Sequence, residues 1–243
     1  MDALTEKQNL YFWADETDDI KPLVVLICGY PYFHPFYDNF IEAFKDKYSF
    51  FVLESFHEYF LWKDTVNVDI LMDFYVNIIE HVLHDRTIYA ITGYCIGSEL
   101  SIHLARRLKQ EGKGNPKVLM MEGEYLRPQY DSIPQQAIEH PLYSEHYRIS
   151  NALTNSFPDT AYDGEIIITL ANNASHRLYL EYGEDINEEE YRALVAEIEE
   201  NKKNWKTHYP NAPFHLFNAT HWTFFDPVNL QDLRKIIEET WDK

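Results

Sequence analysis

The chain has 243 residues, 45% of them apolar, which is enough material for one well-buried domain. Its 40 acidic residues outnumber its 21 basic ones, and the formal net charge of −19 at pH 7 excludes electrostatic attraction to nucleic acid or anionic lipid. No apolar run has the length of a signal-peptide core or of a membrane span, which indicates a soluble cytoplasmic protein.

The first half of the chain alternates between short apolar runs and amphipathic segments. The predicted strands span residues 21–30, 49–55, 87–93 and 117–123. The predicted helices between them span residues 34–48, 68–85 and 98–112. In the second helix, four apolar residues spaced by four form one row, namely Ile70, Phe74, Ile78 and Val82. This alternation implies a parallel sheet covered on both faces, and hence an α/β architecture.

The pattern changes after Gly123. Residues 125–163 combine prolines, five tyrosines (125, 130, 143, 147 and 162) and polar residues without a clean period. An aromatic-rich insertion between core strands predicts a lid. The remaining predicted elements, strands at 165–173 and 214–219 and helices at 186–205 and 229–243, complete a single domain over residues 1–243.

Cysteine and histidine usage gives no sign of a disulfide framework or a metal site. Cys28 and Cys95 are too few for such a framework, and no CxxC or HExxH spacing is present. His81 and His84 lie three residues apart on a predicted helix, but without a third ligand a solvated helix face is the better interpretation. The sequence therefore predicts neither a metal nor an organic cofactor.

The segment ITGYCIGSEL places Cys95 between two glycines, where a strand ends and a helix begins. This is the position of the nucleophile elbow in α/β-hydrolases. Because the backbone turns sharply there, side chains at Gly93 and Gly97 would collide with the neighbouring strand and helix. The helix N-terminus supplies a positive partial charge and a free backbone N–H at Ile96. Both stabilise a thiolate, so a depressed pKa is expected for Cys95.

A base and an acid are also present in the expected order. His221, in FNATHWTFF, follows the last predicted core strand, where this architecture carries its general base. Glu122 and Glu124 both follow the strand KVLMM, and either satisfies the order nucleophile, acid, histidine, because strand ends are uncertain by about two to four residues. No carboxylate follows the next strand, in LANNASH.

Three blocks, TIYAITGYCIGSELSIHLARRLKQEG, KVLMMEG and ATHWTFF, resemble the thioesterase domains that release chains from polyketide synthases and nonribosomal peptide synthetases. The resemblance spans about residues 23–124 and 165–240. In that family the elbow reads G-x-S-x-G-G, the next strand ends in aspartate, and the base lies in a segment like G-D-H-F-T-M. The departures from this pattern are Cys95 for serine, Glu122 for aspartate, Ser98 for the second glycine and Ala219 for the glycine before histidine.

The resemblance implies the α/β-hydrolase fold, with a mostly parallel central sheet, helices on both faces and a lid. It also implies a triad of Cys95 as nucleophile, His221 as base and Glu122 as orienting acid. Glu122 is preferred to Glu124 on the family alignment alone. The implied substrate is an acyl or peptidyl thioester, carried by coenzyme A or by the phosphopantetheine arm of a carrier protein.

The oxyanion hole requires two backbone donors, and Ile96 supplies one of them. The turn LICGYPY resembles the H-G-x turn of many α/β-hydrolases, with Cys28 in place of histidine, and this points to the N–H of Tyr30 as the second donor. Pro31 has no N–H to donate. A small buried residue at a strand end is the better interpretation of Cys28.

Three classes of function remain open. The first is a thioesterase or acyltransferase with a cysteine acyl-enzyme, which suits transfer or cyclisation at least as well as hydrolysis. The second is a small-molecule hydrolase of the dienelactone hydrolase type, which also has cysteine at the elbow, and the third is a non-catalytic relative that binds a ligand.

The densest basic cluster near the elbow comprises Arg106, Arg107, Lys109 and Lys113. It is either a docking patch for an acidic carrier or a solvated helix face.

Overall fold

The computed structural model describes residues 11–13, 20–29, 34–53, 59–61, 63–84, 86–123, 141–158, 161–172, 188–221 and 223–241. Their strands are β1 (Tyr11–Trp13), β2 (Leu23–Ile27), β3 (Ser49–Leu53), β4 (Ile88–Tyr94), β5 (Lys117–Met121), β6 (Ile166–Ala171) and β7 (Phe214–Phe217). Their helices are α1 (His34–Phe44), α3 (Val68–Leu83), α4 (Ile96–Gln110), α6 (Pro141–Asn155), α8 (Glu188–His208) and α9 (Pro227–Trp241). No helix in these ranges is both long and apolar enough to cross a membrane.

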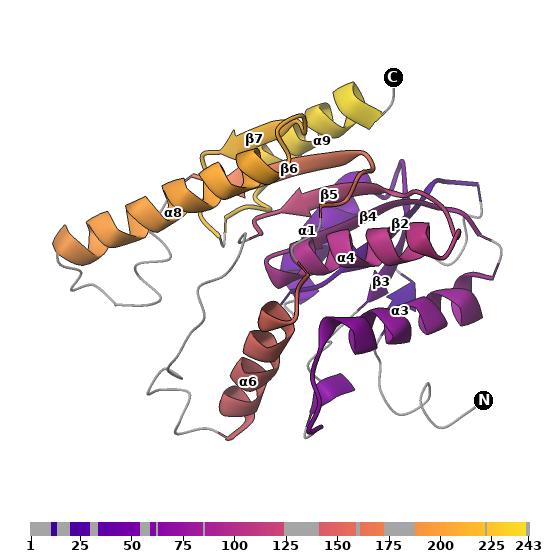
Figure 1. The fold of residues 1–243 in the computed structure, drawn as a ribbon. Helices are drawn as coiled ribbons and strands as arrows, with labels where there is room; N and C mark the ends of the chain where they lie inside the picture. Colours follow the sequence, from indigo (N-terminus) through magenta and orange to yellow (C-terminus); the bar gives the residue numbers. More distant parts are fainter. Residues whose placement is uncertain are drawn as a thin grey trace.

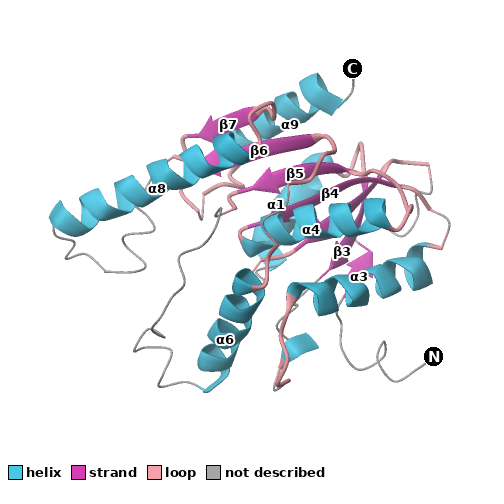
Figure 2. Ribbon diagram, viewed as in Figure 1, coloured by secondary structure: helices cyan, strands magenta, loops and turns pink. Residues whose placement is uncertain are grey.

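Within these residues the seven strands form one sheet in the order β1-β3-β2-β4-β5-β6-β7. The short β1 is antiparallel to β3, and the other six strands are parallel. Helices cover both faces of the sheet (Figures 1 and 2). The predicted α/β architecture is therefore confirmed, and the carboxyl ends of the six parallel strands lie at one edge.

The sheet separates two apolar cores. In β2, Leu23, Val25 and Ile27 contribute to the core under α3, α4, α6 and α8. The alternate residues Val24 and Leu26 contribute to the core under α1 and α9. Because successive strand side chains point to opposite faces and both faces are covered, β2 is a continuous apolar run.

Helix α3 buries a different face from the row read in the sequence. Its buried residues are Val68, Leu71, Met72, Tyr75, Val76, Ile78, Ile79 and Leu83. Ile70, Phe74 and Val82 are only partly buried along its flank, so the row spaced by four is not the core face. Steps of four residues drift by about 40° each around a helix with 3.6 residues per turn, whereas a core stripe mixes steps of three and four.

Helix α6 lies in the segment for which the sequence shows no clean period. Ile149 and Leu153 are fully buried in the core shared with α3 and α4. Just beyond the helix, the hydroxyl of Ser156 accepts the N–H of Val68 at 2.8 Å, which fastens α6 to the start of α3. The described part of the expected lid thus includes a helix packed on the core.

Tyr162, one of the five tyrosines of the expected lid, is buried beside the start of β5. Its side chain is 3% exposed, and its hydroxyl donates to the carbonyl of Pro116 at 2.5 Å. Pro116 precedes β5, and a strand of five residues spans about 17 Å, so Tyr162 lies at the opposite end of the sheet from Cys95. Tyr162 is therefore not beside the elbow, and residues 124–140, 159 and 160 lie outside the described residues.

Candidate active site

Cys95 lies at the junction of β4 and α4. Its φ of 57° and ψ of −132° are unfavourable for a residue with a side chain, at a cost on the order of 1–3 kcal/mol. The turn is held from the neighbouring strand, because the N–H of Cys95 donates to the carbonyl of Met121 at 3.1 Å. The Cys95 side chain is half-buried and makes no capping hydrogen bond to α4.

Glycines surround this turn because neighbouring backbone leaves no room for a side chain. A Cβ at Gly93 would fall on the carbonyl of Gly97, and a Cβ at Gly97 would fall on the carbonyl of Ile27 in β2. The two predicted collisions are confirmed. A Cβ at Gly29 would lie 3.0 Å from the Cβ of Cys95, so the turn after β2 lies directly beside the thiol.

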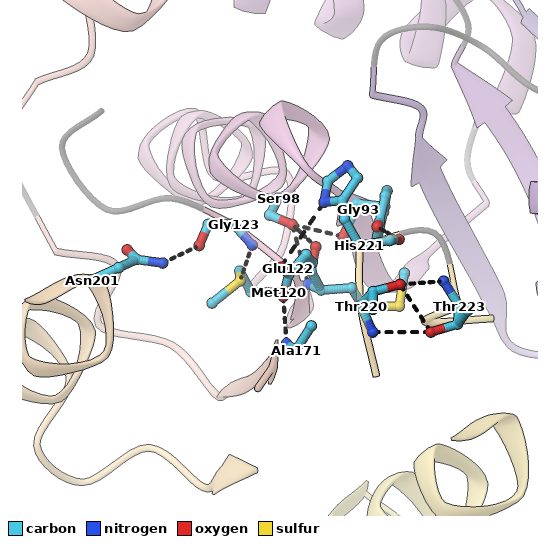
Figure 3. Close-up of polar contacts among 12 residues, drawn as sticks. Gly93, Ser98, Met120, Glu122, Gly123, Ala171, Asn201, Thr220, His221 and Thr223 are labelled. Carbon is cyan, nitrogen blue, oxygen red and sulfur yellow. Dashed lines mark hydrogen bonds and ion pairs between the residues drawn. The ribbon is translucent and has the colours of Figure 1, made fainter. Parts of the chain in front are cut away.

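Glu122 directly follows β5, the neighbour of β4 in the sheet. Its N–H donates to the carbonyl of Thr169 at 2.8 Å, and its Oε2 accepts the N–H of Ala171 on β6. Its Oε1 lies 3.9 Å from Nδ1 of His221 (Figure 3). The carboxylate is therefore anchored through one oxygen and presents the other to the imidazole.

His221 lies in a short turn after β7 that two threonine side chains close. The Oγ1 of Thr223 accepts the N–H of Thr220 at 2.9 Å, and the Oγ1 of Thr220 accepts the N–H of Thr223 at 3.2 Å (Figure 3). Such local side-chain bonds to the backbone hold a turn in one conformation. Sequence reasoning missed this pair, although the Thr-x-x-Thr spacing around His221 was a visible signal.

The electrostatics of the site connect the thiol, imidazole and carboxylate. Burial lowers the pKa of His221, but the interactions with Cys95 and Glu122 outweigh it and raise this pKa to about 10. The 3.9 Å contact with Glu122 is an ion pair longer than a hydrogen bond, so Cys95 contributes the larger part. Linkage is reciprocal: the contact that stabilises the imidazolium also stabilises the thiolate. These contacts therefore favour the charged form of the imidazole.

Ser98 joins the elbow to the end of the next strand. Its buried Oγ lies 2.9 Å from the carbonyl oxygen of Gly93 and 2.5 Å from that of Met121, and it accepts the N–H of Met121 at 3.1 Å (Figure 3). Its single proton serves one carbonyl at a time. The hydroxyl thereby fixes β4 to β5 one residue before Glu122. The sequence showed Ser98 only as a departure from the family pattern, without indicating these contacts.

Of the two backbone N–H groups predicted for the oxyanion hole, the described residues include only that of Ile96. Ile96 is the first residue of α4, a position where the N–H has no acceptor within the helix. The N–H of Gly29 donates to the hydroxyl of Tyr37 at 2.7 Å, which commits that N–H to α1. Tyr30, the predicted second donor, and Glu124, the rival acid, both lie outside the described residues.

The remaining candidate residues have ordinary surroundings. Among the described residues, no three His, Cys, Asp or Glu side chains form a group suited to a metal ion. His81 of α3 and His84, the residue that follows the helix, are both exposed. Cys28 is 1% exposed at the end of β2, and neither Cys28 nor Cys95 forms a disulfide.

No family model matches the chain, and no curated protein matches it in sequence. Among solved structures, the NocB thioesterase domain from the nocardicin cluster matches with a TM-score of 0.60 at 16% identity, over 91% of this chain and 94% of its own. MGS-MChE2, an α/β-hydrolase enzyme from the metagenome of lagoon sediments at Mar Chica, Morocco, matches with 0.61 at 11% identity, over 94% of both chains. YbtT, a type II thioesterase from the yersiniabactin biosynthetic pathway, matches with 0.54 at 8% identity, over 95% of this chain and 98% of its own. At such identities the likeness concerns architecture alone, and the protein has the α/β-hydrolase fold.

Proposed function

We propose that the protein is a thioesterase or acyltransferase that forms an acyl-enzyme at Cys95. The observation that carries this proposal is the convergence of Cys95, Glu122 and His221 at the carboxyl ends of β4, β5 and β7, with the imidazole tied to both partners. Thioesterase domains among the solved structures of this fold support the choice of a thioester substrate.

The proposed reaction has two halves. The Cys95 thiolate attacks the thioester carbonyl carbon, and the N–H of Ile96 stabilises the resulting oxyanion. Collapse breaks the bond to the leaving sulfur, which takes the proton of the His221 imidazolium. The neutral imidazole then removes a proton from water, a hydroxyl or an amine as that group attacks the acyl-enzyme, and Cys95 leaves as thiolate. Glu122 keeps the imidazole oriented and stabilises its charged form.

The choice of cysteine affects the energy of the first half. Attack by a thiolate on a thioester exchanges one thioester for another, so the step is nearly balanced in free energy. The acyl-enzyme therefore stays reactive enough for capture by water, a hydroxyl or an amine. Hydrolysis, transfer and cyclisation are all compatible with this chemistry.

The basic cluster on α4 and in the turn after it does not offer an unpaired docking patch for an acidic carrier protein. Three of its four side chains pair with acidic groups of this chain, as Arg107–Glu111, Lys109–Asp163 and Lys113–Glu80, at 2.5, 2.7 and 2.6 Å. The fourth, Arg106, is half-buried. The solvated-face interpretation is therefore the better one for this cluster, and the proposed donor is a phosphopantetheine or coenzyme A thioester that does not depend on it.

We also propose one domain with a cover between β5 and β6. Its described helix, α6, belongs to the fixed part of that insertion, because Ile149 and Leu153 are fully buried. Tyr162 is not assigned to the cover, because its hydroxyl donates to the carbonyl of Pro116 at the opposite end of β5 from the elbow.

Substrate preference tests the proposal. We expect the purified protein to release thiol from N-acetylcysteamine or coenzyme A thioesters at least about tenfold faster than it cleaves oxygen esters of the same acyl groups, because the thiolate attacks a thioester readily. Products are quantified by chromatography, which avoids thiol reagents that would modify Cys95. Faster opening of an enol-lactone than of any thioester would favour the dienelactone hydrolase class. Ligand binding without turnover would favour the non-catalytic class.

Glu122→Gln is expected to lower turnover by at least about tenfold, while Glu124→Gln has a much smaller effect. The amide cannot stabilise the imidazolium, but its oxygen can still accept the N–H of Ala171, so the fold is retained. The measurement is kcat with a thermal unfolding control for both variants. The reverse ranking would transfer the role to Glu124, and equal small effects would mean that another group orients His221.

A further inference from the structure

Tyr94 is the last residue of β4 and immediately precedes Cys95. Its backbone pairs in register with Met121 of β5, and its side chain is 3% exposed. The ring lies in the core under α1 and α9, against which Cys95 also packs. The sheet therefore holds Tyr94 in a fixed position next to the thiol.

The side chain of Tyr94 contacts His221 at two places. Its hydroxyl donates a hydrogen bond to the backbone carbonyl of His221. Its ring centroid lies 4.7 Å from that of the imidazole, with the planes inclined by 43°. Because Tyr94 is adjacent to Cys95 in the chain, these contacts link the position of the base to the position of the nucleophile.

The phenol is itself rigidly held. Its ring packs on three aromatic neighbours, Tyr37, Phe224 and Phe225, at centroid distances of 6.4, 5.7 and 5.0 Å. Burial, followed by the negative charges of Glu122 and Cys95, raises the pKa of Tyr94 well above its ordinary value, so the hydroxyl stays a neutral donor. The threonine pair closes the turn on itself, whereas Tyr94 ties that turn to the sheet.

We propose that Tyr94 is a positioning residue that holds His221 within reach of Cys95 and so maintains the thiolate–imidazolium pair. The inference rests on the proposed function, because that function assigns the roles of the pair. Among the described residues, the titratable groups that face His221 are Tyr94 from β4, Cys95 from the elbow and Glu122 from β5, with Tyr37 of α1 behind Tyr94. Loss of the hydroxyl leaves the turn closed and the ring contact in place, but it removes the hydrogen bond that ties the backbone of His221 to β4.

The test compares Tyr94→Phe with Tyr162→Phe. Each variant removes one buried hydroxyl that donates to a backbone carbonyl, of His221 in the first and of Pro116 in the second. The readouts are the rate of Cys95 alkylation by iodoacetamide, followed by peptide mass, and the thiolate absorbance, both between about pH 5 and pH 9. Neither readout requires a substrate. Thermal unfolding of both variants corrects for any general loss of stability.

In the wild-type protein, alkylation is expected to stay fast well below the free-thiol pKa of about 8.5. Tyr94→Phe should move the midpoint upward by about 0.5–1 pH unit and slow alkylation near pH 6 by at least about threefold, whereas Tyr162→Phe keeps the wild-type profile. Identical profiles for these two variants would overturn the role of Tyr94.

His221→Ala separates the two possible failures. If His221→Ala raises the midpoint and Tyr94→Phe does not, the thiolate–imidazolium pair exists without help from Tyr94, and the proposed function stands. If His221→Ala also leaves the profile unchanged, the pair does not form, and both the proposed base and the role of Tyr94 are lost.

Discussion

Cys95→Ala is expected to abolish acyl-enzyme formation and to lower thioester turnover by at least about a thousandfold. The variant keeps the N–H of Ile96 and the imidazole of His221, but it has no nucleophile to carry the acyl group. Intact-mass spectrometry after incubation with a thioester provides the measurement. The wild-type protein should gain the mass of one acyl group on Cys95, and the alanine variant should gain none.

Two matched variants accompany this experiment. Cys95→Ser retains a nucleophilic oxygen but forms no stable ion pair with His221, so we expect acylation at the same position at a lower rate. Cys28→Ala removes the other cysteine of the chain, which is 1% exposed, and should leave acylation unchanged. Acyl mass on Cys28, or wild-type turnover by Cys95→Ala, would contradict the assignment of the nucleophile.

The second large effect is expected at His221. His221→Ala should lower turnover by roughly a hundredfold to a thousandfold, because it removes both the base and the cation that stabilises the thiolate. The pKa of His221 is raised to about 10, so the imidazolium is present below that pH and disappears as the pH rises through it. Since the leaving thiol takes its proton from the imidazolium, wild-type acylation should decline only at the alkaline end of the profile. The measurement is the rate of acyl-enzyme formation as a function of pH.

The variant should show the opposite dependence on pH. Without the cation, Cys95 behaves as an ordinary thiol, and the remaining acylation should rise with pH toward about 8.5 and beyond. His81→Ala, which removes an exposed histidine of α3, is the control and should retain the wild-type profile. If His221→Ala were acylated as fast as the wild-type protein at the acid end of the profile, a different group would be responsible for ionising Cys95.

Local patterns in the sequence determined the course of most of the chain. A strand buried on both faces is a continuous apolar run, and the crossover helices show their own period, so the elements expected within 21–123 and 165–243 are present. The sequence did not predict helix α6, because its buried stripe includes a charged residue. Glu145 lies in line with Ile149 and Leu153 and pairs with Arg148. The sequence did not predict strand β1 either, because its three residues are too few to show a period.

The sequence could predict those site residues that directly follow a core strand. Cys95, Glu122 and His221 follow β4, β5 and β7, and the carboxyl ends of parallel strands meet at one edge of a sheet. The glycines beside Cys95 could also be read in advance, because a tight turn excludes side chains wherever it occurs.

The sequence by itself thus determined the fold class and which residue types come to the edge of the sheet. Only the tertiary structure decided which atoms meet there: Oε1 of Glu122 with Nδ1 of His221, the hydroxyl of Ser98 with the end of β5, and the hydroxyl of Tyr94 with the carbonyl of His221. Each contact joins groups on different strands or loops, so it depends on strand register and on the path of the turn after β7. The period within one segment reports only which face of that segment is buried, and it carries no information about the partner that another segment brings to it.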